Sequence, residues 1–95
     1  MDFTDFILRV FKKRDRATIM ADILKSVTGA QRGKRKTNIM QSANLSSDLV
    51  NKYLDVLLRN GFVVLAEGYM YRPTSKGLRF LQNLENDYLK LKFRV

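Results

Sequence analysis

The order of structural signals between Lys36 and Gly77 constrains the fold of this chain more than any other feature. Apolar residues recur with helical spacing up to Asn60-Gly61, and a β-branched and aromatic stretch interrupted by Glu67-Gly68 follows. Thr74 then opens a further helical pattern. Because the hydrophobic period changes from that of helices to that of strands and back, the segment predicts helices, a hairpin and another helix.

Two helices joined by a tight turn are predicted before the hairpin. Thr37 is expected to cap a short helix containing Ile39, Met40 and Ala43, and Asn44 can adopt the left-handed conformation of a tight turn. Ser46 is expected to cap the next helix, which Gly61 ends. The apolar stripe of that helix consists of Leu49, Val50, Tyr53, Leu54, Leu57 and Leu58.

The hairpin is predicted from two short strands, residues 62–66 and 69–72, with Glu67-Gly68 as a two-residue turn. Alternation predicts that Tyr69 and Tyr71 share one face, with Tyr71 in the core. Pro73 is expected to end the second strand, and Thr74 or Ser75 to cap the last helix.

The chain before this segment predicts two more helices. Residues 1–14 carry an apolar face. Asp15 can open a second helix whose stripe is Ile19, Met20, Ile23, Leu24 and Val27, and Thr28-Gly29 closes it. The predicted fold class is mainly α with a small β-hairpin: a winged helix-turn-helix domain at 15–74, preceded by an N-terminal helix at 1–14 and followed by a C-terminal dimerisation helix at 75–95.

Composition narrows the possible functions. The chain has 95 residues, enough for one small domain, and its net charge of +9 favours a polyanionic partner. Cysteine and histidine are absent, which excludes thiolate metal sites and the usual zinc ligand and general base. No paired carboxylates replace them, so we expect no enzyme activity, metal, cofactor or small-molecule substrate. With no apolar run of membrane-spanning length and no signal-peptide pattern, we expect a cytoplasmic protein.

Charged and polar residues around the predicted helix-turn-helix are candidates for contacting DNA. A recognition helix presents the residues near its N-terminus to base edges, and cationic loops neutralise phosphates. A solvated helix face or a flexible loop would show a similar pattern. The predicted DNA-binding residues are Arg32, Lys34, Arg35, Lys36, Thr37, Ser46, Ser47, Asn51, Lys52 and Arg72.

Both terminal helices are candidates for dimerisation. The last one repeats apolar residues with the 3-4 spacing of a coiled-coil seam. Packing within one chain is the alternative for both, and the N-terminal helix would also suit a membrane surface. The predicted dimerisation residues are Phe3, Phe6, Ile7, Val10, Leu81, Leu84, Tyr88 and Leu91.

The chain resembles the small archaeal winged-helix DNA-binding proteins, including the crenarchaeal nucleoid proteins of the "ten-a" group. The resemblance covers about residues 16–92. It is carried by Lys36-Thr37, Ile39-Met40, Ala43-Asn44-Leu45-Ser46, Tyr53-Leu54, Leu57, Gly61-Phe62, Tyr71 and Thr74-Ser75-Lys76-Gly77. It implies a homodimer joined by an antiparallel coiled coil of C-terminal helices, and duplex binding with modest sequence preference. It also implies that residues 46–60 form the recognition helix and residues 62–73 the wing.

These observations favour a homodimeric protein that binds double-stranded DNA, either a transcriptional regulator or an architectural nucleoid protein. A winged-helix module that binds another protein and no DNA is the remaining alternative.

Overall fold

The computed structural model describes the backbone of residues 15–93 and the side chains of residues 15–87. The predicted helix at 1–14, with Phe3, Phe6, Ile7 and Val10, lies outside the described residues. The elements run in the order α2 (Arg16–Thr28), α3 (Lys36–Ala43), α4 (Ser47–Arg59), β1 (Val63–Ala66), a 3-10 turn (Glu67–Tyr69), β2 (Met70–Pro73) and α5 (Ser75–Phe93). The predicted class, mainly helical with a two-stranded antiparallel hairpin, is confirmed.

Side-chain caps set the starts of three helices as predicted. The Asp15 carboxylate accepts a hydrogen bond from the Thr18 amide at 2.8 Å, which holds the pKa of Asp15 below its ordinary value. Ser46 Oγ accepts from the Leu49 amide at 3.3 Å. Thr74 Oγ1 accepts from the Gly77 amide at 3.0 Å and so caps α5. Each cap satisfies a backbone donor that the first helical turn leaves unpaired.

The turn between α3 and α4 also has the predicted geometry. Asn44 is left-handed, with φ 53° and ψ 55°, and Leu45 donates its amide to the Met40 carbonyl at 3.0 Å. Leu45 is buried, so the turn is anchored in the core as well as by hydrogen bonds. The two helices therefore have a defined relative orientation, and this is the helix-turn-helix of the fold.

The start of α3 differs from the prediction. Arg35, in extended conformation, occupies the cap position without a side-chain cap bond, and Thr37 lies inside the helix. The cause lies in Lys34, whose backbone pairs with Tyr71 of β2. Because that pairing keeps the chain extended up to Arg35, the helix begins directly after it, at Lys36.

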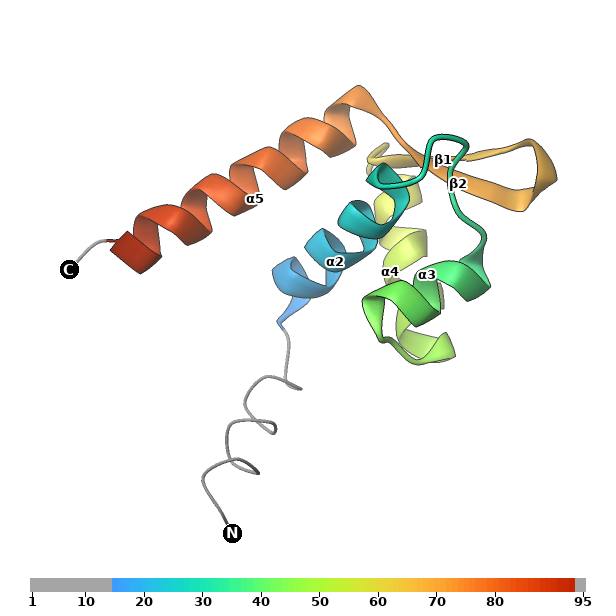
Figure 1. Ribbon diagram of the computed structural model, residues 1–95, viewed down its shortest axis with the longest axis horizontal. Helices are drawn as coiled ribbons and strands as arrows, with labels where there is room; N and C mark the ends of the chain where they lie inside the picture. Colours follow the sequence, from blue (N-terminus) through green and yellow to red (C-terminus); the bar gives the residue numbers. More distant parts are fainter. Residues whose placement is uncertain (1–14, 94–95) are drawn as a thin grey trace, which may run out of the picture.

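One hydrophobic core holds the helices and the hairpin together. α2 packs against α3, α4, α5 and β2, so it occupies the centre of the molecule (Figure 1). The stripe predicted for α4 is buried except at its edges, where Leu49 and Leu58 are about one third exposed. The most deeply buried side chains are Ile23, Leu24, Val27, Ile39, Val50, Leu54, Leu57 and Val63.

The hairpin turn is longer than predicted. Ala66 pairs with Met70, so three residues, Glu67–Tyr69, connect the strands. Tyr71 packs against the core and is therefore fixed in register; a slip of one residue would turn its ring to the other face. Tyr69 lies in the turn, 80% exposed, so the prediction that Tyr69 and Tyr71 share a face of the strand is wrong.

The contacts at the junction between the hairpin and α5 explain why Thr74 and Gly77 occupy their positions. The Thr74 hydroxyl donates to the Gly61 carbonyl, and the Thr74 amide donates to the Phe62 carbonyl at 3.0 Å. A Cβ atom on Gly77 would lie 2.0 Å from the Phe62 carbonyl oxygen, so no side chain fits there. Phe62 also stacks on Phe80 of α5, with ring centroids 4.3 Å apart. The first turn of α5 is thus fixed to the hairpin, and the rest of the helix extends past α2 (Figure 1).

Candidate nucleic-acid interface

The outer face of α4 carries polar side chains toward solvent. Ser47, Asn51 and Lys52 are all exposed, as predicted for a helix that offers groups to base edges. Ser46 is exposed too, but its hydroxyl oxygen is used as the helix cap. The Lys52 ammonium lies 5.5 Å from the centroid of the Tyr53 ring, which orients it along the helix surface. Hydroxyl, amide and ammonium groups therefore stand side by side near the first turns of α4.

Acidic residues interrupt this face. Asp48 lies in the first turn of α4, where the helix dipole stabilises a carboxylate. Asp55 forms an exposed ion pair of 3.1 Å with Arg59, one turn further on. Because Arg59 is paired along its own helix, the unpaired polar groups of the face are concentrated at the N-terminal half of α4.

The segment before α3 is fixed to the hairpin. We call residues 29–35 the basic loop. The Lys34 amide donates to the Tyr71 carbonyl at 3.0 Å, and the Tyr71 amide donates to the Lys34 carbonyl at 2.7 Å. The loop therefore adds a one-residue bridge to β2. Sequence periodicity did not reveal this pairing, because it joins residues 37 positions apart in the chain.

Gly33 makes the bridge possible. Its φ of 90° is in the left-handed region, and a Cβ atom there would lie 2.5 Å from the Tyr71 carbonyl oxygen and 2.7 Å from Arg72 Cγ. Only glycine allows this conformation and this distance together. The basic loop is thus held by backbone geometry, and its side chains start from defined positions.

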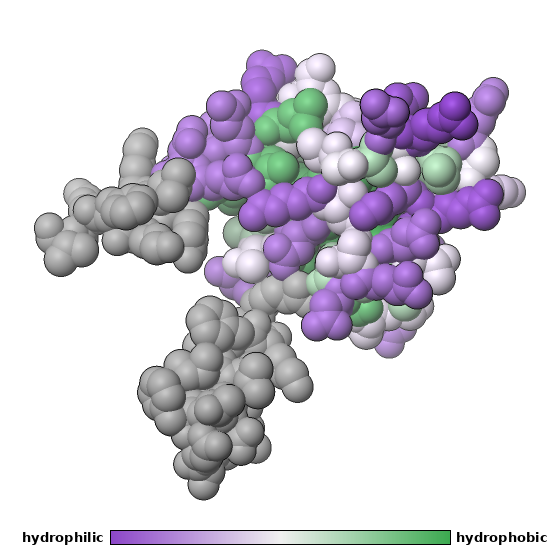
Figure 2. All heavy atoms as spheres, viewed as in Figure 1, coloured by the Kyte–Doolittle hydropathy of each residue, from purple (hydrophilic) through white to green (hydrophobic). Residues whose placement is uncertain are grey.

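Four exposed cations surround this junction, and we call them the basic edge: Arg32, Arg35, Lys36 and Arg72. The Arg72 guanidinium donates to the Gln31 carbonyl at 3.4 Å, which joins β2 to the loop a second time. Figure 2 shows strongly hydrophilic side chains gathered at the end of the molecule where the loop and the hairpin lie. Such a group of cations can neutralise neighbouring phosphates.

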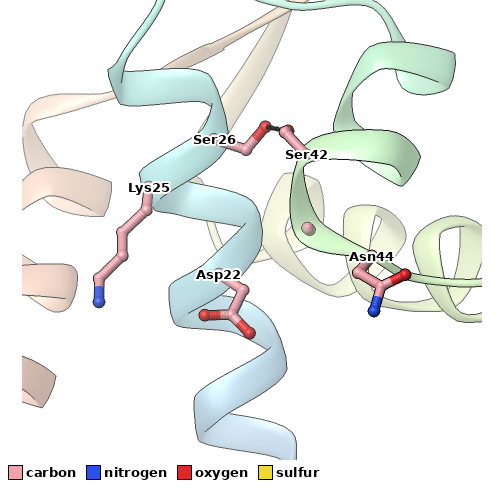
Figure 3. Close-up of a pocket in the computed structure, with 6 residues that line it drawn as sticks. Asp22, Lys25, Ser26, Ser42 and Asn44 are labelled. Carbon is pink, nitrogen blue, oxygen red and sulfur yellow. Dashed lines mark hydrogen bonds between the residues drawn. The ribbon is translucent and has the colours of Figure 1, made fainter.

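Lys34 differs from its neighbours. Its side chain is half-buried, and Nζ donates to Ser26 Oγ of α2 at 3.4 Å. Ser26 also shares a hydrogen bond with Ser42 of α3 (Figure 3). The structure places Lys34 against α2, so of the predicted cations it is the one least available to a phosphate.

Lys36 and Thr37 lie at the start of α3 and are exposed. The first amides of a helix carry partial positive charge, and here no side chain caps them. Lys36 therefore extends the basic edge to the first turn of α3, and a phosphate contact by either residue stays a prediction.

An open hollow lies between α2 and the end of α3, bordered by Asp22, Lys25, Ser26, Ser42 and Asn44. Figure 3 shows Lys25 and Asn44 on opposite sides of the Ser26–Ser42 contact, each pointing away from it. Lys25 instead pairs with Glu85 of α5 at 3.6 Å. The polar groups therefore do not converge on one point. Within residues 15–87, no group of acidic side chains could hold a metal ion.

The predicted dimerisation residues of α5 are placed differently from one another. Leu81 is buried in the core of a single chain, and Leu84 is half-buried. Tyr88 and Leu91 belong to α5 but lie beyond the described side chains. Leu81 thus has an intrachain role, and a dimerisation role for any of the four stays a prediction. None of the described helices is both long and apolar enough to cross a membrane.

Comparison with known proteins identifies proteins that are similar to this chain in sequence or in structure. The uncharacterized protein MJ0290 of Methanocaldococcus jannaschii is 37% identical over 73 residues, which cover 77% of this chain but 33% of that protein. The DNA-binding protein Sso10a-2 of Sulfolobus solfataricus has a similar structure, with a TM-score of 0.70, 26% identity, and coverage of 83% of this chain and 82% of that one. A Listeria innocua protein of unknown function shares the fold at a TM-score of 0.63 and 20% identity, covering 72% of this chain and half of that one.

The chain therefore spans a third of the archaeal relative and half of the Listeria protein. The family match is broader: residues 13–92, from before α2 to nearly the end of α5, match the winged helix-turn-helix family. With the left-handed turn at Asn44, the buried Leu45 after it, the hairpin after α4 and this match, the chain belongs to the winged helix-turn-helix family.

Proposed function

We propose that this protein binds double-stranded DNA, with α4 as the recognition helix and the basic edge on the phosphate backbone. The observation that carries the proposal is the pairing of Lys34 with Tyr71, which fixes the cations Arg32, Arg35 and Arg72 around one junction. Cations on a fixed backbone lose less conformational freedom when they bind phosphates than cations on a mobile loop. Similarity to a protein described as DNA-binding supports the same function.

In this proposal the basic edge contacts phosphates and the polar face of α4 contacts bases. Phosphate contacts by Arg32, Arg35 and Lys36, aided by Thr37 and Arg72, supply affinity without sequence information. Ser47, Asn51 and Lys52 reach the major groove, where an amide can bond adenine bidentately and an ammonium can bond guanine. The acidic Asp48 and Asp55 on the same helix limit how much non-specific affinity α4 itself contributes.

We further propose that two copies associate through α5. The helix runs for 19 residues and extends past α2 (Figure 1). Its described contacts with its own chain include the stacking of Phe80 on Phe62 and the ion pair of Glu85 with Lys25. The apolar spacing of Leu84, Tyr88 and Leu91 continues along it. Sedimentation at micromolar concentration is expected to give twice the chain mass of 11.1 kDa, and a monomer mass would refute the dimer.

A duplex titration at several salt concentrations tests DNA binding and separates two roles. Random DNA is compared with the DNA upstream of the protein's own gene. Tighter binding to the upstream DNA by a factor of about 10³ or more indicates a transcriptional regulator. Equal affinity for both, falling steeply with salt, indicates architectural binding. Failure to bind either duplex at low salt would leave a protein-interaction module as the function.

A charge-reversed variant tests the basic edge within the same experiment. Arg32→Glu with Arg35→Glu is expected to weaken binding to both duplexes and to lower the salt slope by about 1.8, since each lost phosphate contact removes about 0.9. The matched control is Arg16→Glu with Arg79→Glu, which changes net charge equally at exposed positions on α2 and α5. Equal weakening by both variants would show that total charge, and not the basic edge, determines affinity.

A further inference from the structure

All the charged side chains of α4 lie in one row on the side of the helix opposite its buried stripe. They are exposed and follow one another at spacings of four, three and four residues: Asp48, Lys52, Asp55 and Arg59. The signs alternate along the row, and the two carboxylates balance the two cations. The basic edge, by contrast, contains cations alone. Attraction to phosphates is therefore not what the row on α4 contributes.

The two carboxylates of this row differ in their partners. Asp55 is paired with the Arg59 Nε atom at 3.1 Å, so its charge is compensated within the helix. The Asp48 carboxylate has no ion pair or hydrogen bond with any residue whose side chain the structure describes. Lys52, one turn further on, lies over the Tyr53 ring instead. Asp48 therefore presents an uncompensated negative charge near the start of α4.

The helix start explains why Asp48 is tolerated but not what it contacts. A carboxylate in the first turn is stabilised by the partial positive charge of the helix N-terminus. The cap itself is supplied by Ser46, whose hydroxyl accepts from the Leu49 amide. An uncharged polar residue in place of Asp48 would therefore leave the cap intact and preserve the helix.

The width of α4 determines which DNA groove its charged row can face. A helix with its side chains is about 10–12 Å across, which fits the major groove of about 12 Å and not the minor groove of about 6 Å. The middle of an inserted helix face points to base edges, and its flanks point to phosphates. Asp48 lies in the middle row, and phosphates repel it from the groove walls. Its carboxylate therefore faces base edges.

The chemistry of the base edges identifies a partner for this carboxylate. An ionised carboxylate only accepts hydrogen bonds, and the donors in the major groove are the N4 amino group of cytosine and the N6 amino group of adenine. Adenine carries its N7 acceptor beside N6, which repels the second carboxylate oxygen. Cytosine carries a C–H group beside N4 and has no such acceptor. Cytosine is thus the base that fits Asp48.

We propose that Asp48 accepts a hydrogen bond from N4 of a cytosine and makes binding selective for duplexes with a C·G pair beneath the first turns of α4. The proposal rests on the DNA binding proposed above and deepens it. On any other base the carboxylate faces acceptors or a methyl group without gaining a bond. Lys52 lies in the same row and can donate to O6 or N7 of a guanine. Asp48 therefore lowers affinity for most sequences and retains it for one class.

The test is selection from a library of randomised duplexes by the full chain and three variants. Asp48→Asn removes the charge and keeps the size, and asparagine bonds N6 and N7 of adenine bidentately. Asp48→Ala removes the acceptor altogether. The matched control is Asp87→Asn, which makes the same change in net charge at an exposed position on α5. Thermal unfolding of each variant shows whether it folds.

The unmodified protein and Asp87→Asn are expected to select the same duplexes, with cytosine preferred about tenfold over the other bases at one position. Asp48→Asn should select adenine at that position, and Asp48→Ala should have no preference there. A second measurement replaces this cytosine by N4-methylcytosine, which pairs with guanine but presents a methyl group in place of its major-groove N–H. The unmodified protein should then bind about tenfold more weakly, and Asp48→Ala should change by less than about twofold.

Three results would overturn the proposal while leaving DNA binding intact. The first is tighter binding of Asp48→Asn to every duplex with the same bases selected, which would mean that the carboxylate only repels phosphates. The second is a lower melting temperature of Asp48→Asn with unchanged base preference, which would confine Asp48 to a role in the helix. The third is equal affinity of the unmodified protein for cytosine and N4-methylcytosine duplexes, a comparison that needs no variant. If the unmodified protein binds no duplex at low salt, the DNA-binding function itself is refuted.

Discussion

The basic loop and the hairpin tip are two connections next to the same small sheet, and they are held in opposite ways. The loop is tied to β2 through both backbone groups of Lys34 and through Arg72. The tip, Glu67–Tyr69, extends beyond the last strand pair with its side chains exposed. The loop carries cations, whereas the tip carries one carboxylate and one uncharged ring.

The loop and the tip therefore differ in how far their side-chain positions are set before any partner binds. Lys and Arg side chains lose much rotamer freedom when they bind, so a rigid starting point on the loop lowers the entropy cost of phosphate contacts. An aromatic ring has only two torsions to fix and contributes through its apolar area. It can therefore be placed at the end of a short turn without further support.

The largest effect is expected from glycine substitutions that test how tightly each connection is held. Gly33→Ala should lower the free energy of unfolding by about 3 kcal/mol, because a left-handed alanine costs about 1–2 kcal/mol and the overlap with Tyr71 adds about 1–3. Gly68→Ala should cost only about 1–2 kcal/mol, since its added Cβ would be 3.9 Å from the nearest atom, Met70 Cγ. Urea denaturation measures both, and equal losses would show that the loop is not the more constrained connection.

A change of charge at the tip should have the next largest effect. Glu67→Lys is expected to tighten duplex binding about threefold to tenfold at low salt and to steepen the salt slope by up to about 0.9, because a new cation comes within reach of a phosphate. Asp87→Lys, at an exposed position on α5, is the control with the same change in net charge. If both variants gain equally, the tip lies no nearer to DNA than α5 does.

The smallest effects are expected at two adjacent cations of the basic loop, Lys34 and Arg35, which should differ in their effects on stability and on duplex affinity. Lys34→Met removes the hydrogen bond to Ser26 and should lower the free energy of unfolding by about 1 kcal/mol. Arg35→Met should change stability little but weaken duplex binding more than Lys34→Met does, because its side chain is exposed. Thermal unfolding and a duplex titration on both variants give the answer. A larger loss of affinity in Lys34→Met would place its ammonium on the DNA side.

The local elements of the fold could be predicted from particular residues. The caps at Asp15, Ser46 and Thr74 lay where short polar side chains precede apolar periodicity, and the left-handed Asn44 marked the turn. Most of the α4 stripe is buried as the spacing of its apolar residues indicated. These features depend on residues within a few positions of one another, so the sequence contains the information directly.

The candidate site was only partly predictable, because some of its contacts join segments that are distant in the chain. The exposure of Ser47, Asn51 and Lys52 follows from the helical period of α4. The inward contact of Lys34 with Ser26 does not, because it depends on where α2 lies relative to the loop. The N-cap expected at Thr37 was wrong because a contact with Tyr71, distant in sequence, sets the start of α3.

The sequence by itself determined the kinds of element, their order, the helix starts at the side-chain caps and the excess of positive charge. Tertiary structure alone decided the register of the hairpin, the bridge from the basic loop to β2 and the placement of Leu81 inside one chain. The physical reason is how far apart along the chain the interacting residues lie. Helix caps and periodicity act over one or two turns, whereas strand register and close backbone approach depend on packing between segments distant in the chain.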